Sequence, residues 1–383
     1  MKSINLTIQK AAYGGYGLGF HEGKACFVPY AVPGDVAEIE IIQDKKSLIF
    51  GRIIRLEREA VTRIKPECPN FGICGGCDYL NITYEAELEI KKNILRESIV
   101  RIAGMNAGNI PEISVVCADR FGYRSHASVK SDGKGVFGFY MRDSNTLVPF
   151  PDGGCRLLAP PLVELLKSMN APQTQEKHAA DELKIACSDK GDCFTSAGEK
   201  RIVRELVNGI VYERDISLFF QANRFLRSKM LDIVKEYADT DSSGEFLDIG
   251  CGVGFFTLYL AKHAKQANGI DISKDAIKQA KRNAKLNEIG NASFEARSAS
   301  GAGSLKHKYH TVIADPPRAG LSANARVALK ALAPGRIVYV SCDPATFARD
   351  SRDIASCGYR MQKLTLIDMF PGTQHIEVIA LFS

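Results

Sequence analysis

Residues 246–254 read FLDIGCGVG, an apolar run followed at once by three closely spaced glycines. A short apolar run bounded by glycine is typical of a buried strand. Glycines at the end of such a strand let the backbone approach a ligand closely where the next helix begins. The stretch predicts a strand over 245–249, a helix over 256–263 and a ligand-binding loop between them. Helices and strands alternate along 216–383, which indicates a parallel sheet covered by helices.

An acidic residue ends the next predicted strand. Asp271 lies in the run 268–272, about twenty residues after the glycine loop, where a carboxylate can accept hydrogen bonds from both ribose hydroxyls of a nucleotide-like ligand. The loop has no Lys-Ser/Thr pair of the kind that binds phosphates. Together these features favour S-adenosylmethionine over a dinucleotide or ATP.

Two more polar motifs follow apolar runs further along the chain. DPPR at 315–318 follows the run 311–314, and SCDP at 341–344 follows the run 336–340. In enzymes that methylate exocyclic amino groups, an aromatic residue commonly follows Asn/Asp-Pro-Pro. The arginine in its place argues against that reaction. A cysteine at a strand end, on a turn that proline stiffens, is a candidate nucleophile.

Cys342 has a candidate partner in Glu377, which stands beside the last predicted strand, 378–382. Neighbouring strands of one sheet would bring the two side chains to the same edge. Carbon methylation of a pyrimidine requires such a pair, because a thiolate that attacks C6 makes C5 nucleophilic and a base then removes the C5 proton. The thiolate must exist at neutral pH, so we expect the surroundings to lower the pKa of Cys342. Methylation of cytosine C5 stays open, because those RNA enzymes carry a cysteine in this loop or in the preceding strand-end loop.

The composition limits the class of protein. A chain of 383 residues with 45% hydrophobic residues predicts two or three domains with full cores. No apolar run is long enough to span a membrane, and the first residues lack the pattern of a signal peptide, so we expect a cytoplasmic protein. The formal net charge of +6 is compatible with an anionic partner but does not identify one.

Eleven cysteines in a reducing compartment indicate metal ligation or catalysis before disulfides. Cys68, Cys74 and Cys77 have the spacing C-x5-C-x2-C with glycine and proline between them. Cys155, which follows a glycine pair, is the best candidate for a fourth ligand. Zinc and an iron–sulfur cluster are both compatible, and the spacing favours the cluster because zinc sites more often use paired C-x2-C ligands. The spacing differs from the C-x3-C-x2-C loop of radical enzymes, which counts against radical chemistry.

The upstream segments predict two smaller domains. Residues 1–57 form short alternating runs separated by glycine turns, which indicates a small β-barrel. Residues 58–215 are interpreted as a mixed α+β domain. In this domain we expect a charged helix at 84–103 to face solvent. A strand at 122–130 carries Tyr, Arg, His and Lys, which could meet an RNA backbone and stack bases.

The whole set of motifs resembles the RNA uracil-5-methyltransferase family along nearly the entire chain. The resemblance is carried by the glycine hairpin of a TRAM-like barrel at 13–20, the cysteine set, FFQAN at 219–223, the glycine loop, DPPR, SCDP and the terminal FPxTxHxE at 370–377. It implies a multidomain α/β protein in three parts. These are a TRAM-like, OB-like RNA-binding β-barrel over 1–57, a central α+β iron–sulfur and RNA-binding domain over 58–215, and a Rossmann-like class I methyltransferase domain over 216–383.

The resemblance also implies roles for individual residues. By similarity, Cys342 is the nucleophile and Glu377 the general base, and Asp315 lies close to the target base as well as to the cofactor. The residues implied to line the S-adenosylmethionine site are Gln221, Gly250, Asp271 and Asp315. The residues implied to hold a [4Fe–4S] cluster are Cys68, Cys74, Cys77 and Cys155.

The barrel and cluster together are similar to the bacterial 23S ribosomal RNA enzymes and to some archaeal transfer-RNA enzymes. We therefore expect a monomeric enzyme that acts on 23S ribosomal RNA, with transfer RNA as the alternative partner and no membrane contact. A non-catalytic RNA-binding or assembly factor is the alternative from another class. Three positions depart from the family: Gly250 stands where an aromatic residue is usual, Asp271 where glutamate is usual, and Ser298 where Asp or Asn commonly contacts the adenine.

Overall fold

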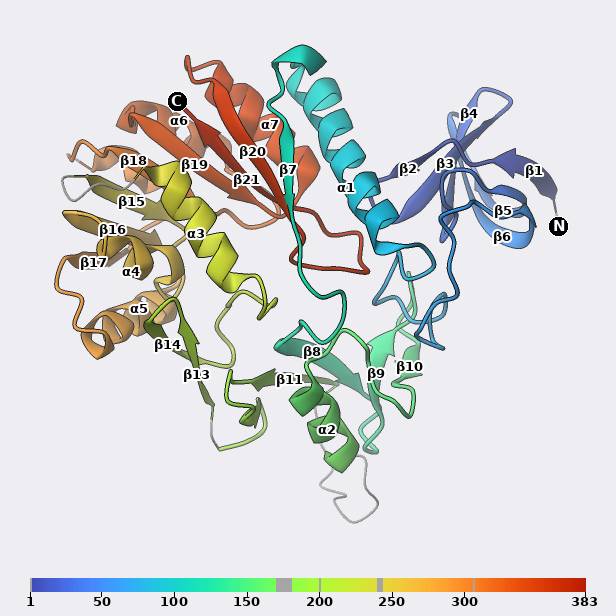
Figure 1. The fold of residues 1–383 in the computed structure, drawn as a ribbon, viewed down its shortest axis with the longest axis horizontal. Helices are drawn as coiled ribbons and strands as arrows, with labels where there is room; N and C mark the ends of the chain where they lie inside the picture. Colours follow the sequence, from blue (N-terminus) through green and yellow to red (C-terminus); the bar gives the residue numbers. More distant parts are fainter. Residues whose placement is uncertain (1, 170–180, 200, 240–243, 306) are drawn as a thin grey trace.

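The computed structural model describes residues 2–169, 181–199, 201–239, 244–305 and 307–383. Figure 1 shows three groups of elements: the N-terminal strands β1 to β6, the strands β8 to β12 with helix α2, and a large C-terminal sheet with helices on its faces. The surface linker that the sequence predicts over 171–179 lies outside the described residues. Among the described helices, none is both long enough and apolar enough to cross a membrane.

The N-terminal group is a six-stranded sheet with the order β1-β5-β6-β4-β3-β2. Its apolar residues alternate along the strands, so one side of each strand supplies a core that contains Leu6, Val28 and Ile39. Cys26 is fully buried in this core, as expected for a packing residue. Its strands are β1 Ser3–Thr7, β2 Lys10–Ala12, β3 Tyr16–His21, β4 Lys24–Pro29, β5 Val36–Asp44 and β6 Leu48–Arg58.

The central group is a five-stranded sheet with the order β10-β9-β8-β11-β12, and helix α2 contacts β11 and β12. The strand expected at 122–130 begins later, at His126, and Tyr123 is fully buried with its hydroxyl donating to the Pro371 carbonyl. The expectation that this tyrosine could stack bases is therefore wrong, because its ring lies in the interior. The elements are β8 His126–Ser131, β9 Phe137–Tyr140, β10 Leu147–Pro149, α2 Pro160–Met169, β11 Glu182–Cys187 and β12 Cys193–Thr195.

The C-terminal sheet has eight strands in the order β17-β16-β15-β18-β19-β21-β20-β7. Strands β15 to β19 run parallel, and β21 enters antiparallel between β19 and β20. The chain passes from β15 to β16 on one side and later returns to β18 on the other, so the crevice of a doubly wound sheet opens at the end of β15. The strands are β7 Ile113–Val116, β15 Glu245–Ile249, β16 Gln266–Asp271, β17 Ala292–Ala296, β18 Thr311–Ala314, β19 Arg336–Ser341, β20 Met361–Ile367 and β21 Glu377–Phe382.

Helices cover both faces of this sheet, which is why its strands are apolar on both sides (Figure 1). In β19, for example, Ile337 and Tyr339 pack into one core and Val338 and Val340 into the other. One face carries α6 Ala323–Leu332 and α7 Pro344–Ala355, and the other carries α3 Arg227–Ala238, α4 Phe255–Ala261 and α5 Lys274–Leu286. The short helical turns are Ile99–Ala103, Ala107–Asn109 and Ala299–Ser304.

Parts of the segment 58–215 belong to the C-terminal layer. Helix α1, Tyr84–Ser98, buries Ile94 and Leu95 in the same core as α6 and α7, so the expectation that it only faces solvent is wrong. Its polar residues Glu87 and Lys91 are also buried, where they form an ion pair of 2.8 Å. Strand β7 extends the sheet beside β20. The hairpin of β13, Ile202–Val207, and β14, Ile210–Asp215, packs on α4 and α5. The division into 1–57, 58–215 and 216–383 stays a prediction.

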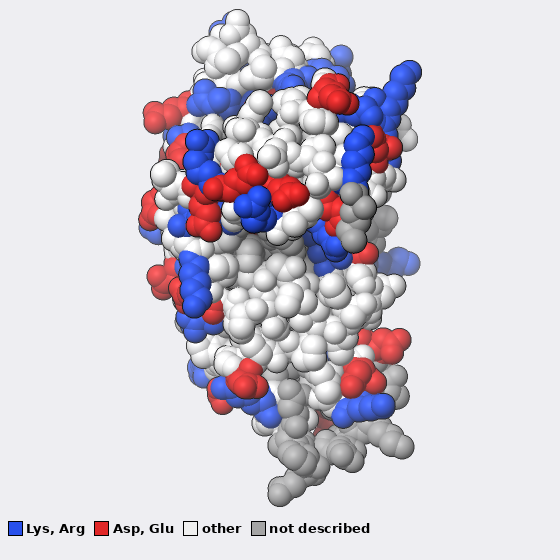
Figure 2. Space-filling model, turned by 90° about the vertical axis from the view of Figure 1, so that its right-hand side faces the viewer, with Lys and Arg blue, Asp and Glu red and all other residues white. Residues whose placement is uncertain are grey.

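Figure 2 shows the side of the molecule that lies at the right of Figure 1. On this face Lys and Arg stand next to Asp and Glu, and a broad area without charged side chains lies between the charged groups. The net charge of +6 is therefore not gathered into one basic surface on this face.

Candidate active site

The strand ends of the C-terminal sheet meet around a cavity of about 920 Å³. Every residue that the sequence predicts for catalysis and for S-adenosylmethionine lines this cavity, although the residues come from six separate places in the chain. They are Gln221, Gly250, Asp271, Asp315, Cys342 and Glu377. Ser298, which stands where the family commonly has Asp or Asn, lines it too.

The glycine loop joins β15 to α4 at the floor of this cavity. Gly250 has φ +86, and a Cβ atom there would lie 2.6 Å from the carbonyl oxygen of Asp315. A side chain at this position would therefore meet both backbone strain and a backbone clash. Gly252, with φ +53, donates its N–H to Asp271 Oδ2 at 3.0 Å. The end of β16 is thus tied to the loop after β15.

Asp271 is fixed on both sides by backbone. While Oδ2 accepts from Gly252, Oδ1 accepts from the N–H of Ser273 at 2.8 Å, at the start of α5. Each oxygen keeps a second lone pair that can accept a hydroxyl proton. This geometry is compatible with a carboxylate that holds the ribose of a nucleotide-like ligand.

Buried carboxyl groups lie close together near the glycine loop. Burial, with the Asp248 and Asp271 carboxylates nearby, raises the pKa of Asp315 to about 8. Burial, with Asp271, raises the pKa of Asp248 to about 7, although Thr257 donates two hydrogen bonds to its Oδ2. Asp248 Oδ1 is buried without a hydrogen-bond partner. A cationic ligand such as a sulfonium would favour the ionised forms of these carboxyl groups, so the residues present fit S-adenosylmethionine.

Cys342 and Glu377 are brought together by strand pairing. Cys342 follows β19, Glu377 begins β21, and in this antiparallel pair Ser341 lies opposite Val378. The turn after the cysteine is fixed by Asp343, whose Oδ1 accepts the N–H groups of Ala345 and Thr346 at 3.0 and 2.8 Å as the N-cap of α7. The expectation that strand neighbours place both side chains at one edge is confirmed.

The expectation of a lowered thiol pKa is wrong for the chain by itself. Burial, followed by the charges of Glu377 and Asp315, raises the pKa of Cys342 to about 12. Burial and Asp315 also raise the pKa of Glu377 well above its ordinary value. The charge of Arg318 acts in the opposite direction on both groups. The sequence already placed Glu377 beside the thiol, but burial, the largest cause of the raised pKa, depends on how the whole site packs and could not be read from the motifs.

Several residues of the site were not predicted as functional. Arg318 donates through Nη2 to a ring nitrogen of His375, with Nη2 2.9 Å from Nδ1, and both line the cavity. Burial, followed by the charge of Arg318, lowers the pKa of His375 to about 4, so its ring is neutral at pH 7. At the rim, Phe219 and Ile272 are 71% and 80% exposed, although both are large and apolar. Three of these residues, Phe219, Arg318 and His375, lie in the motifs FFQAN, DPPR and FPxTxHxE. The sequence singled out these motifs but gave no role to the three side chains.

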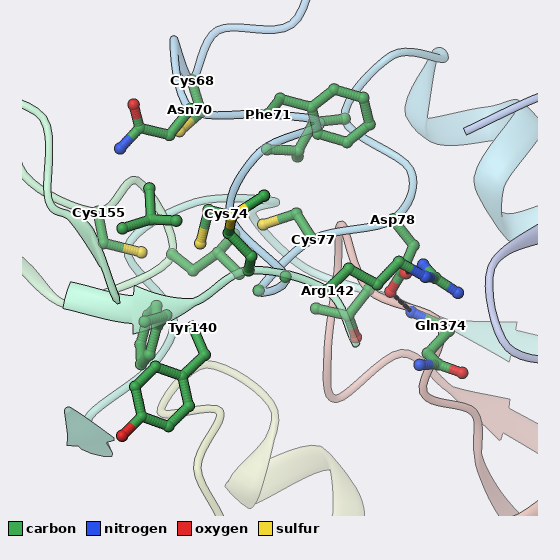
Figure 3. Close-up of a pocket in the computed structure, with 18 of the residues that line it drawn as sticks. Cys68, Asn70, Phe71, Cys74, Cys77, Asp78, Tyr140, Arg142, Cys155 and Gln374 are labelled. Carbon is green, nitrogen blue, oxygen red and sulfur yellow. Dashed lines mark hydrogen bonds and ion pairs between the residues drawn. The ribbon is translucent and has the colours of Figure 1, made fainter. Parts of the chain in front are cut away.

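The four cysteines predicted as ligands line a second cavity, of about 620 Å³ (Figure 3). Cys77 and Cys155 point their sulfur atoms towards its middle from opposite sides. Burial and the neighbouring thiols raise the pKa of Cys77 well above its ordinary value and that of Cys155 to about 11. Among the residues that the structure describes, no group of three or more His, Cys, Asp or Glu side chains has the arrangement of a metal site. The cysteines are gathered, but a cluster is not shown.

The two cavities are neighbours, because Arg124 and His375 line both. The remaining cysteines lie elsewhere. Cys187 and Cys193 face each other across β11 and β12, and Cys251, within the glycine loop, is a buried packing residue.

Comparison with known proteins gives consistent results. Residues 202–383 match the family model described as tRNA (Uracil-5-)-methyltransferase. The chain is 33% identical over 429 residues to an RNA methyltransferase of Aquifex aeolicus described as uncharacterized. This match covers 99% of the chain and 98% of the relative. It is also 30% identical over 430 residues to the 23S rRNA (uracil(1939)-C(5))-methyltransferase of Yersinia enterocolitica. That match covers 100% of the chain and 95% of the relative.

Among solved structures, the fold is similar to that of the tRNA (uracil-54, C5)-methyltransferase of Pyrococcus abyssi in complex with S-adenosyl-L-homocysteine. The TM-score is 0.77 at 24% sequence identity, and the match covers 99% of this chain and 100% of that chain. This likeness shows that the elements of the present chain have the arrangement of a methyltransferase fold along its whole length.

Proposed function

Since the chain belongs to the RNA uracil-5-methyltransferase family, and is therefore an S-adenosylmethionine-dependent enzyme that methylates uracil C5 in RNA, we propose that its substrate is 23S ribosomal RNA. We also propose that the transfer uses a covalent bond between Cys342 Sγ and uracil C6. The observation that carries the covalent route is the position of Cys342 beside Glu377 in the cavity that also contains the glycine loop.

In this mechanism, the Cys342 thiol first gives up its proton to water, and the thiolate Sγ then attacks C6 of the uracil. The electron pair of the C5–C6 double bond shifts towards C5 and the O4 carbonyl, so C5 becomes nucleophilic. S-adenosylmethionine, when bound, supplies the methyl group as an electrophile. The Glu377 carboxylate then takes the proton of C5, the double bond re-forms, and Sγ leaves as a thiolate. The Arg318 guanidinium faces the negative charge that develops on the thiolate and the ring.

The residues that would hold S-adenosylmethionine are Gln221, Gly250, Asp271 and Asp315. In this proposal, Asp271 accepts hydrogen bonds from the ribose, and the glycine at position 250 allows the ligand to approach the backbone. The buried carboxyl groups of Asp248 and Asp315 favour a cationic ligand over a neutral one. The positive charge of the donor would stabilise the ionised forms of these carboxyl groups.

We further propose that Cys68, Cys74, Cys77 and Cys155 hold a [4Fe–4S] cluster and that the N-terminal sheet is a TRAM barrel that contacts RNA. Four thiols that line one cavity fit a thiolate-bound metal, because the metal's charge would lower the pKa values that burial raises in Cys77 and Cys155. Methyl transfer as written above needs no electron from such a cluster. Analysis of iron and acid-labile sulfide in anaerobically purified protein tests the cluster, with the exposed Cys117→Ala variant as a control and zinc without sulfide as the contradicting result.

Transfer RNA is the second candidate substrate, and the description of the matching family model favours it. The two are separated by incubating the protein and methyl-labelled S-adenosylmethionine with 23S ribosomal RNA and transfer RNA that lack 5-methyluridine. We expect label in 5-methyluridine of 23S ribosomal RNA at a single nucleotide. Label confined to transfer RNA would overturn the substrate proposal, and label in 5-methylcytidine would overturn the assignment to uracil.

A further inference from the structure

Asp78 directly follows the proposed ligand Cys77 and holds the loop that leads to Glu377 (Figure 3). Its N–H donates to the carbonyl of Gly372 at 2.8 Å, and its Oδ2 accepts the N–H of Gln374, also at 2.8 Å. Gln374 stands three residues before Glu377 in the sequence. Asp78, at the end of the cysteine segment (residues 68–78), therefore fixes the loop at two backbone points.

Arg142, in the turn between β9 and β10, connects Asp78 to the N-terminal sheet. Its Nη1 donates to Asp78 Oδ1 at 2.6 Å, and its Nη2 donates to the carbonyl oxygen of Gly14. The guanidinium carbon lies 4.5 Å from the centre of the Tyr16 ring, which it covers. The Arg142 and Asp78 side chains are only 18% and 6% exposed, so solvent screens this pair weakly.

We propose that Asp78 and Arg142 are positioning residues for the proton-abstraction step: together they set the place of Glu377 by fixing the loop 368–376 against the cysteine segment and the N-terminal sheet. The proposal rests on the proposed function, in which Glu377 is the base. A guanidinium has rigid, directed donors, so Arg142 can hold Asp78 in the orientation that Gln374 requires. Glu377 is the first residue of β21, and a shift of its loop displaces its carboxylate directly.

The order of the chemical steps gives this proposal a specific signature. Attack by Cys342 and methyl transfer come before Glu377 acts, and neither Asp78 nor Arg142 contributes to the turn that carries Cys342. Loss of either residue should therefore slow resolution of the adduct more than its formation. A purely structural defect would instead lower the amount of adduct together with the product.

The test compares Asp78→Asn, Arg142→Gln and Arg142→Lys with the unaltered enzyme and with Glu377→Gln, using unmodified RNA substrate. We expect kcat of Asp78→Asn and Arg142→Gln to fall by about 10- to 100-fold, the scale of a misplaced catalytic group, while KM for RNA changes by less than about threefold. An RNA–protein adduct that resists denaturant should accumulate in both variants. Arg142→Lys keeps the charge without the fork, so we expect it to fold and to show a smaller loss.

A matched control is Arg204→Gln, which removes a guanidinium from an exposed ion pair with Glu213 on the β13–β14 hairpin and should leave kcat and adduct unchanged. If Glu377→Gln forms no adduct, the proposed base is wrong. If Glu377→Gln accumulates adduct but Asp78→Asn and Arg142→Gln turn over normally and accumulate none, the positioning role is wrong. A rise in KM with unchanged kcat would overturn it as well, because Arg142 would then act by contacting RNA.

Discussion

Cys342 lies at the end of β19 and Glu377 at the start of β21, and the antiparallel pairing of these strands sets the thiol beside the carboxylate in one cavity. Their charges interact strongly enough that Glu377 is the largest electrostatic cause, after burial, of the raised pKa of Cys342. A nucleophile and a base held this close can act on the two adjacent carbons C6 and C5 of one pyrimidine ring.

This relationship predicts different outcomes for the two residues. Cys342→Ala should have no detectable turnover and should form no adduct with RNA that contains 5-fluorouridine, because the bond to C6 cannot form. Glu377→Gln should retain the attack, lose about 10²- to 10⁴-fold in turnover, and accumulate adduct on ordinary RNA. Adduct is measured by denaturing gel electrophoresis and turnover by nucleoside mass spectrometry.

The control for the cysteine is Cys357→Ala, since Cys357 is partly buried just beyond α7 and does not line the cavity. It should behave like the unaltered enzyme. Full turnover by Cys342→Ala would exclude the covalent route.

The raised thiol pKa predicts slow chemical modification of Cys342 in the free protein. Only the thiolate reacts with iodoacetamide, so its rate should rise about tenfold for each pH unit up to the pKa of about 12. Arg318→Gln should lower the rate at pH 9, because the guanidinium favours the thiolate. Asp315→Asn should raise it, because the ionised carboxylate disfavours the thiolate. Peptide mass spectrometry follows the labelling of Cys342, and shifts of equal sign in the two variants would contradict this account.

Buried carboxyl groups predict a pH dependence of stability. The pKa of Asp248 is raised from 3.8 to about 7 in the folded protein. Between these two pH values, the folded chain therefore keeps a proton that the unfolded chain has lost. Stability from this group is fully present below pH 3.8 and falls as pH rises to about 7, with a slope of up to about 1.4 kcal/mol per unit. Asp248→Asn removes this titration, and its free energy of unfolding should therefore depend less on pH between 5 and about 8.

Chemical denaturation at several pH values, without ligand, measures this effect. Asp239→Asn is a suitable control, because Asp239 pairs with Arg336 and its side chain is 63% exposed. Its pH dependence should match that of the unaltered protein. An unchanged slope in Asp248→Asn would show that the carboxyl is ionised in the folded state.

The sequence predicts the strands of this fold from local patterns, as the strand-end motifs show. The runs before Gly250, Asp315 and Cys342 each form a strand within a residue or two of the expected bounds, because burial on both faces requires continuous apolar segments. The ends of parallel strands share an edge, so the site followed from the motifs. The covalent roles of its residues stay predictions.

The parts that could not be predicted depend on contacts between distant segments. Strand β7 joins the C-terminal sheet by parallel pairing with β20, although about 250 residues separate them along the chain, and no local pattern specifies that neighbour. The same holds for Arg142, whose partners Asp78 and Gly14 come from two other segments. In sequence terms Arg142 is an ordinary polar residue of a turn.

The glycine loop predicts a contrast between two neighbouring substitutions. Gly250 and Gly252 both have positive φ, so an alanine at either position costs about 1–2 kcal/mol of backbone strain. Only at Gly250 would the new Cβ meet backbone, at 2.6 Å from the Asp315 carbonyl oxygen, whereas nothing lies within 4 Å of a Cβ at Gly252. Gly250→Ala must therefore push apart the ends of β15 and β18, which both contribute to the cavity.

We expect Gly252→Ala to weaken binding of S-adenosylhomocysteine by about tenfold or less, and Gly250→Ala by about 100-fold or more, as measured by calorimetry. Gly252→Ala serves as the matched control, since it changes the same loop with the same added methyl group. Equal losses in the two variants would mean that strain alone decides binding. A normal affinity in Gly250→Ala would show that the bound donor does not depend on the close approach of the two strand ends.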